Sequence, residues 1–276
     1  MLVTFIERRD RMDKLLLRDY LSARVISDNK ELDNYSKMYY QTNENLVDVY
    51  LDLDFEDKSV LSVVSSSDQL FTPMLLGARE VDGFDKNRLT KYYYYLRKWV
   101  IKYNKEVYPM EMVQGNKDYL IKLLEKVRVS SEEEAKAYKF WRLLYNHDTN
   151  LESLFTEDDR NIGKTLFDDN VHYLEQLNLG QLNFSDYNFF EDIDSSKKYD
   201  FIMMSNILET SRNSLGKLVV ARDNLNRLLN RNGIVICSHL IHQATGMNDL
   251  ELEVFSEKFE FDDYGLDKGY VYKKRS

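Results

Sequence analysis

Hydrophobic and polar residues alternate along this chain in blocks that predict strands and helices in turn. A run of apolar, mostly β-branched residues at 60–64 is followed by five polar residues at 65–69, and then by a helix-length segment that ends at Gly77. A second short strand is predicted at 81–84, and Asp85 follows it directly. The chain therefore contains a strand, helix, strand unit with a carboxylate placed after its second strand.

Helical patterns occupy most of the remaining chain, and strand signals return only in its last third. Apolar residues recur at helical spacing in four stretches, at 5–27, 43–53, 88–108 and 110–180. Short apolar or aromatic runs predict strands at 187–190, 201–204 and 234–237, and a final pair at 259–263 and 270–274. A helix is predicted from 214 to 229, because Asn232 and Gly233 form a signal for a helix stop and a turn.

This order of elements predicts a three-layer α/β fold with a mostly parallel sheet and a C-terminal antiparallel hairpin. Three parts are expected: an N-terminal helical cap at 1–57, a core at 58–109 and 181–276, and a helical insertion at 110–180. Ligands of open parallel sheets bind beyond the carboxyl ends of the strands. The insertion is therefore the expected source of substrate specificity.

The composition narrows the class of protein. With 43% hydrophobic and 31% charged residues, the chain is typical of a globular protein. No apolar run reaches the roughly 20 residues that span a bilayer, and the N-terminus is too charged for a secretory signal. We therefore expect a cytoplasmic protein without a transmembrane segment. A single cysteine, Cys237, excludes an internal disulfide, and the four histidines lack acidic partners at ligand spacing, so no metal is expected.

The net charge of −9 argues against binding to bulk nucleic acid, which requires a basic surface. One segment departs from this acidic average, because basic residues between Lys86 and Lys105 alternate with Trp99 and the run Tyr92–Tyr95. We interpret it as an amphipathic helix with a solvated charged face, in which the tyrosines mainly pack. A structured RNA that meets this helix remains an open alternative.

Polar side chains follow three successive predicted strands. Asp85 follows the second strand, Asp192 comes after the third, and Ser205 and Asn206 come after the fourth. A carboxylate after the second strand can accept hydrogen bonds from ribose hydroxyls, and one after the third can accept from an adenine amino group. Together these positions favour a bound nucleoside, as in other nucleotide-binding strand, helix, strand units.

These residues resemble the Rossmann-like S-adenosylmethionine-dependent transferases. The resemblance spans about 58–110 and 185–275, and it includes the fourth-strand motif YDFIMMSNILE and the fifth-strand segment LLNRNGIVICSH. It implies S-adenosyl-L-methionine as cofactor, held by Asp85, Asp192 and Ser205. The acidic net charge favours a small molecule, a lipid headgroup or a protein as acceptor over bulk nucleic acid. Nicotinamide dehydrogenases use a similar layout, but the missing GxGxxG motif and the C-terminal hairpin favour the transferases. Tyr40 is also expected to reach the cofactor.

The loop after the first strand departs from that of common methyltransferases. It has no glycine, and Ser62 stands where those enzymes carry an acidic residue. The sequence Ser65-Ser66-Ser67-Asp68-Gln69 is similar to the S-A-G-D-N loop of the 3-amino-3-carboxypropyl transferases that make betaine-lipid precursors. That resemblance implies a cofactor-binding loop in which Ser65, Asp68 and Gln69 lie along the methionine moiety. Both methyl transfer and aminocarboxypropyl transfer remain open.

A sulfonium cofactor carries its own activated carbon, so such an enzyme needs chiefly to align the acceptor and exclude water. Asn206 and Glu209 are our candidates for contacting the acceptor. His239 and His242 could take its proton, although packing is the commoner role for a single histidine. A non-catalytic relative that binds a nucleoside, or a scaffold, is the alternative from another class, and the serine at position 62 fits it.

Overall fold

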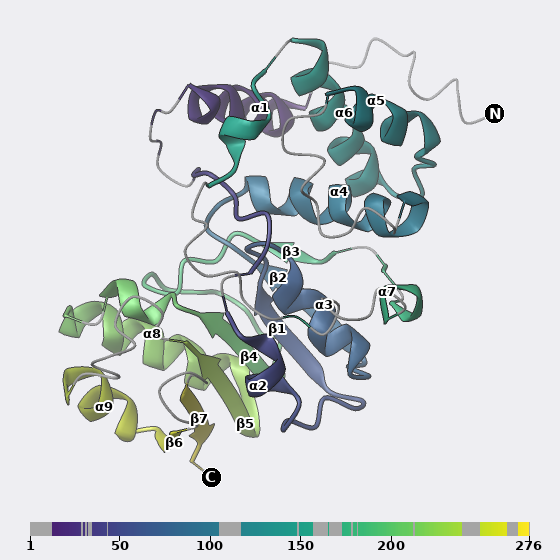
Figure 1. The fold of residues 1–276 in the computed structure, drawn as a ribbon. Coiled ribbons are helices and arrows are strands. Elements are labelled where there is room, and N and C mark those ends of the chain that lie inside the picture. The colour runs from purple at the N-terminus through teal and green to yellow at the C-terminus, as the bar shows by residue number, and fades with distance from the viewer. Residues whose placement is uncertain are drawn as a thin grey trace.

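A computed structural model gives the fold of the 276-residue chain (Figure 1). It describes residues 13–28, 30, 32, 35–42, 44–104, 117–147, 149–156, 165, 173–177, 179–180, 182–211, 213–238, 249–263 and 270–275.

The elements follow one another as strands and helices in alternation. The helices are α1 (Lys14–Ser27), α2 (Leu46–Tyr50), α3 (Asp68–Leu75), α4 (Leu89–Asn104), α5 (Lys117–Lys126), α6 (Glu132–Asn146), α7 (Tyr173–Gln176), α8 (Leu215–Leu228) and α9 (Asp249–Ser256), with short 3₁₀ helices η3 (Glu152–Leu154) and η4 (Leu208–Ser211). The strands are β1 (Ser59–Val63), β2 (Glu80–Phe84), β3 (Phe184–Ser185), β4 (Tyr199–Ser205), β5 (Leu229–Cys237), β6 (Phe259–Asp263) and β7 (Tyr270–Lys274).

One sheet of seven strands, in the order β3-β2-β1-β4-β5-β7-β6, forms the centre of the described structure. The pairs from β3 to β5 are parallel, whereas β7 runs antiparallel to both β5 and β6. This is the doubly wound order 3-2-1-4-5-6 with one antiparallel strand inserted between β5 and β6. The predicted Rossmann-like α/β fold and its antiparallel C-terminal pair are confirmed.

The alternating side chains of the central strands explain why both faces of the sheet are covered. Leu61 and Val63 of β1 pack in a core with α8 and α9, whereas Val60 packs in a second core with α2. All five residues of β1 are buried. A strand that is buried on both faces needs a continuous apolar run, which is the pattern that predicted β1.

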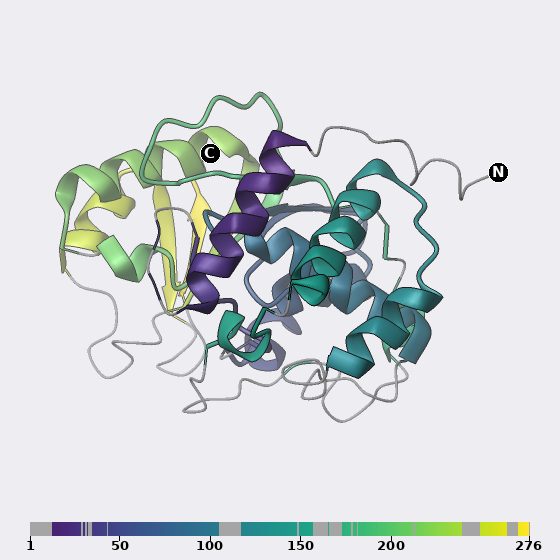
Figure 2. The same cartoon turned by 90° about the horizontal axis from the view of Figure 1, so that it is seen from above.

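A helical layer lies beyond α4, as Figures 1 and 2 show, where α1 runs alongside α6. Helix α4 is covered on both sides: Tyr92 stacks on Phe140 of α6 with ring centroids 4.0 Å apart, and Tyr94 meets Phe71 of α3 at 5.8 Å. The four tyrosines at 92–95 are all buried, in agreement with the packing role that we predicted.

The prediction of a solvated basic face on α4 is wrong. Because neighbouring layers cover most of this helix, Arg88 directly before it and Lys91, Arg97 and Lys98 within it are buried and paired with carboxylates from elsewhere in the chain, whereas Lys102 near its end is exposed. The pairs are Arg88 with Asp19 and Asp186, Lys91 with Asp19, Arg97 with Asp68, and Lys98 with Glu134. The segment is therefore a core element, and it offers little of the basic surface that an RNA would need.

Two boundaries also differ from the prediction. The third strand is Phe184–Ser185, and the aromatic run at 187–190 belongs to the loop after it. Helix α8 ends at Leu228, so Asn232 and Gly233 lie inside β5, where the register against β4 shifts. Asn232 adopts a left-handed conformation with φ of 62°, at the place where the strand is irregular. Among the described residues, no helix is long and apolar enough to cross a membrane.

Candidate functional site

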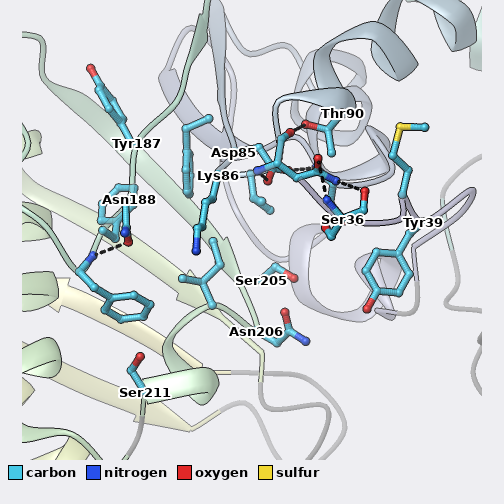
Figure 3. Close-up of a pocket in the computed structure, with 18 of the residues that line it drawn as sticks. Ser36, Tyr39, Asp85, Lys86, Thr90, Tyr187, Asn188, Ser205, Asn206 and Ser211 are labelled. Atoms are coloured by element: carbon cyan, nitrogen blue, oxygen red, sulfur yellow. Dashed lines mark hydrogen bonds between the residues drawn. The ribbon is translucent and has the colours of Figure 1, made fainter. Parts of the chain in front are cut away.

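A cleft of about 620 Å³ opens at the carboxyl ends of β1, β2, β3 and β4. Its walls come from the ends of these strands, from the segment 36–39 and from the start of α8 (Figure 3). The order of the sheet reverses between β1 and β4, which is where ligands bind in open α/β sheets. The volume lies in the range of small-molecule sites.

Asp85 is held at the rim of this cleft by two backbone amides. The N–H of Ser65 donates to its Oδ2 at 2.9 Å, and the N–H of Asn87 donates to its Oδ1 at 2.8 Å. Burial raises the pKa of Asp85 to about 6, although these hydrogen bonds oppose the rise. Each carboxylate oxygen can accept a further hydrogen bond, so Asp85 can still receive hydroxyl groups of a ligand.

The loop between β1 and α3 has the backbone of a glycine-rich turn although it holds no glycine. Ser65 and Ser67 adopt φ values of 42° and 78°, in the left-handed region that favours glycine. Such a conformation costs a non-glycine residue about 1–2 kcal/mol. Ser65 lines the cleft, whereas the hydroxyl of Ser67 is buried without a hydrogen-bond partner. Strain of this kind is common at binding sites.

A buried ionic network behind the loop holds this strained conformation. Asp68 accepts a hydrogen bond from the N–H of Thr42 at 2.8 Å and another from the hydroxyl of Ser66 at 2.8 Å. Its Oδ1 pairs with Nη2 of Arg97 at 2.8 Å, and Arg97 also donates to the carbonyl of Ser66. The loop, the segment before α2 and helix α4 are thereby joined.

A second buried carboxylate, Glu44, lies under the end of β4. It accepts a hydrogen bond from the hydroxyl of Ser205, which itself has a φ of 53° and lines the cleft. Burial raises the pKa of Glu44, against the effect of this hydrogen bond. Gln69 belongs to the same cluster, since its Nε2 donates to Thr42 Oγ1 at 3.1 Å. The segment 42–44 therefore supports both the loop after β1 and the end of β4.

An aromatic wall faces Asp85 across the cleft. It consists of Tyr187, Phe189 and Phe190 from the loop after β3, together with Asn188 and Glu191. Asn188 donates from Nδ2 to Oε1 of Glu191 at 2.6 Å and accepts from the N–H of Phe190 at 3.1 Å. Aromatic rings beside amide and carboxylate groups suit a flat, polar-edged ring such as adenine.

The structure brings four of the sequence-predicted residues together in the cleft: Ser65, Asp85, Ser205 and Asn206. The rest of the predicted loop, Ser66, Ser67, Asp68 and Gln69, is buried behind the cleft wall. Asp192 does not reach the cleft, because its side chain is 92% exposed and pairs with Arg227 at 3.0 Å.

The other predicted residues lie elsewhere or outside the description. The carbonyl of Tyr40 accepts a hydrogen bond from Tyr93, and its neighbour Tyr39 is the tyrosine that lines the cleft. The side chain of Glu209 and the whole of His239 and His242 lie outside the described residues.

Sequence reasoning missed the aromatic wall and the lysines of the cleft, Lys37, Lys86 and Lys217. The aromatic run at 187–190 was read as a strand, and Lys86 was assigned to the helix that follows it. Adjacency to Asp85 was the one signal that could have placed Lys86 at the site. Within the described residues, no group of three or more His, Cys, Asp or Glu side chains could hold a metal ion.

Comparison with known proteins identifies no close relative. The sequence matches no protein-family model, and no curated protein is significantly similar to it. Among solved structures, the N-methyltransferase NodS from Bradyrhizobium japonicum WM9 is similar with a TM-score of 0.36 and 7% identity, over 96% of this chain and 100% of that one. NodS in complex with S-adenosyl-l-homocysteine gives a TM-score of 0.34 and 7% identity, over 98% of this chain and 93% of that one. At these values the likeness carries no argument about function.

Proposed function

We propose that this protein is an S-adenosylmethionine-dependent transferase, most simply a methyltransferase that acts on a small molecule. The observation that carries the proposal is Asp85, fixed by two backbone amides at the end of β2 and facing a cleft at the carboxyl edge of the sheet. The strand order supports it, because the antiparallel β7 distinguishes this sheet from the fully parallel 3-2-1-4-5-6 order of dinucleotide-binding enzymes.

The residues of the cleft fit an adenosine group. Asp85 retains acceptor capacity on both oxygens, as recognition of two ribose hydroxyls requires. The half-buried aromatic side chains Tyr187 and Phe190 offer apolar surface for a base, and Asn188 lines the cleft beside them. The left-handed conformation of Ser65 brings backbone to the cleft edge, where a glycine-rich turn would otherwise approach the ligand.

When bound, the sulfonium cofactor would supply an activated carbon for transfer. The chain would then bind the cofactor, orient the acceptor and exclude water from the cleft. Asn206 lies beside Ser205 at the end of β4, and we assign it to orienting the acceptor. Glu209 and His239 remain candidates for acceptor contact and proton removal.

The burial of the loop side chains supports methyl transfer over aminocarboxypropyl transfer. The resemblance to the 3-amino-3-carboxypropyl transferases implies that Asp68 and Gln69 lie along the methionine moiety of the cofactor. Here Asp68 is committed to Arg97, Ser66 and Thr42, and Gln69 to Thr42, all behind the cleft wall. The same burial is compatible with a protein that binds a nucleoside without transferring a group, so binding and turnover need separate tests.

Isothermal titration with S-adenosylhomocysteine and S-adenosylmethionine tests the site. We expect both to bind to the wild type, and we expect Asp85→Ala to weaken binding by about tenfold or more, because two hydrogen bonds to an ionised group are lost. Asp192→Ala is the matched control, since it removes an exposed carboxylate from the same half of the sheet. If neither ligand binds at millimolar concentration, the proposal is wrong.

Mass spectrometry of the by-product tests the reaction. With S-adenosylmethionine and a library of small-molecule acceptors, methyl transfer releases S-adenosylhomocysteine, whereas aminocarboxypropyl transfer releases methylthioadenosine. We expect S-adenosylhomocysteine. Cofactor binding without either by-product, across amine, hydroxyl and carboxylate acceptors, would favour the non-catalytic alternative.

A further inference from the structure

One side of the cleft collects groups that suit an anion. Ser211 of η4, which Figure 3 labels, and Lys217 in the first turn of α8 both line the cleft.

A serine hydroxyl on this side of the cleft is available to a ligand. Ser211 is only 4% exposed, yet it lines the cleft, and Figure 3 shows its hydroxyl directed toward the cavity. That hydroxyl makes no hydrogen bond to any described residue, whereas the carbonyl of Ser211 accepts from the N–H of Ser214 at 2.8 Å. The hydroxyl can therefore form a hydrogen bond with a ligand in the cleft.

The charges that face the cleft favour a negatively charged ligand. Lys37, Lys86 and Lys217 line it, and none of the three forms an ion pair with a described residue. Figure 3 shows Lys86 reaching from beside Asp85 into the cavity, and Nζ of Lys217 lies 5.7 Å from the centre of the Phe190 ring. The two carboxylates of the lining, Asp85 and Glu191, already accept hydrogen bonds from the protein.

We propose that the acceptor molecule carries an anionic group, a carboxylate or a phosphate, and that Ser211 and Lys217 bind it, with Lys86 as a further cation. This inference rests on the proposed transferase function, since it assigns the acceptor end of the same cleft. It is independent of which group is transferred. Because the chain has a net charge of −9, this group of lysines is not part of a generally basic surface, and it would attract an anion specifically to the cleft.

The test uses inorganic phosphate and benzoate as probes, titrated into the full-length protein that has been saturated with S-adenosylhomocysteine. We expect at least one probe to bind, and we expect Lys217→Met and Ser211→Asp each to weaken its binding by about tenfold or more. Lys139→Met is the matched control, because Lys139 is an exposed lysine on α6, outside the cleft. Circular dichroism and the melting temperature of each variant show whether the fold is retained.

The outcomes separate the subsite from the proposed function. Loss of binding in Lys217→Met and Ser211→Asp, with Lys139→Met unchanged, supports the subsite, and the preferred probe tells carboxylate from phosphate. Equal losses in all three variants, or no binding of either probe to the saturated protein, would overturn it. A probe that competes with S-adenosylhomocysteine would also overturn it, because the anion would then occupy the cofactor's place. If S-adenosylhomocysteine itself does not bind, the transferase proposal fails, and with it the assignment to an acceptor.

Discussion

Arg97 and Asp68 form an ion pair at 2.8 Å in which the side chains are 0% and 1% exposed. Arg97 lies in the middle of α4, and Asp68 is the first residue of α3, directly after the serine loop. The pair therefore connects the helical layer to the loop that borders the cleft. Burying two charges is unfavourable unless hydrogen bonds compensate them. Asp68 also accepts from Thr42 and Ser66, and Arg97 also donates to the carbonyl of Ser66.

Replacement of Arg97 tests the importance of this pair. Arg97→Met leaves Asp68 buried without its counter-ion, so we expect the free energy of unfolding to fall by about 3–5 kcal/mol. Urea denaturation measures the loss. Lys102→Met, at an exposed position on the same helix, is the control and should change stability by less than about 0.5 kcal/mol. Similar effects of the two substitutions would show that the pair has no special role.

Replacement of Ser67 by glycine should stabilise the protein, whereas replacement of Arg97 should destabilise it. The φ of 78° at Ser67 is unfavourable for a side chain, and its buried hydroxyl has no partner, so Ser67→Gly should raise the free energy of unfolding by about 1 kcal/mol. Ser66→Gly is the contrasting variant, because it removes the 2.8 Å hydrogen bond to Asp68 and should destabilise the protein by about 1 kcal/mol. Thermal or urea unfolding measures both. A destabilising Ser67→Gly would mean that the serine is not strained.

Cofactor binding should depend on pH through the protonation of Asp85. Its pKa is raised to about 6 by burial, so the folded protein keeps this proton to a higher pH than an exposed aspartate would. Only the carboxylate can accept from two ribose hydroxyls while it holds two amides. The affinity for S-adenosylhomocysteine should therefore rise with pH, by about tenfold between pH 5 and pH 7.5. Calorimetric titration across this range measures it, and Asp85→Ala should bind weakly at every pH. A flat profile for the wild type would contradict the assigned role.

Glu44 predicts a pH dependence of stability. Burial raises its pKa above the ordinary value of 4.5, so the folded chain binds this proton more tightly than the unfolded chain does. The contribution of Glu44 to stability is therefore lost as pH rises from that value through the raised pKa. Glu44→Gln should remove this loss, so its melting temperature should exceed that of the wild type at alkaline pH and match it more closely near pH 4. An unchanged pH profile would show that the glutamate titrates normally.

Elements whose signals are local could be predicted from the sequence alone. The buried strand β1 was predicted because a strand with two covered faces requires a continuous apolar run. The carboxylate that follows β2 and the antiparallel C-terminal pair were also predicted, from short strand patterns and the turns between them. Asp85 could also be placed at the site, since the carboxyl ends of parallel strands meet at one edge of the sheet. The short β3 was misplaced because two residues carry no periodicity, and the aromatic run beside it resembled a strand more closely.

Which polar side chains face the cleft, and which lie behind its wall, depends on how distant segments pack together. Asp68 and Gln69 have the composition of a binding loop, but their partners Arg97 and Thr42 are 29 and 27 residues away in the sequence. The basic residues of α4 resemble a solvated face, yet Lys91, Arg97 and Lys98 are buried and pair with carboxylates from other segments. Burial and charge pairing depend on contacts between segments that are distant in the sequence. Hydrophobic periodicity shows which face of an element is apolar, but it does not show which distant residues contact that element. For the same reason, the sequence could not show that Lys217 of α8 and Ser211 of η4 line the cleft.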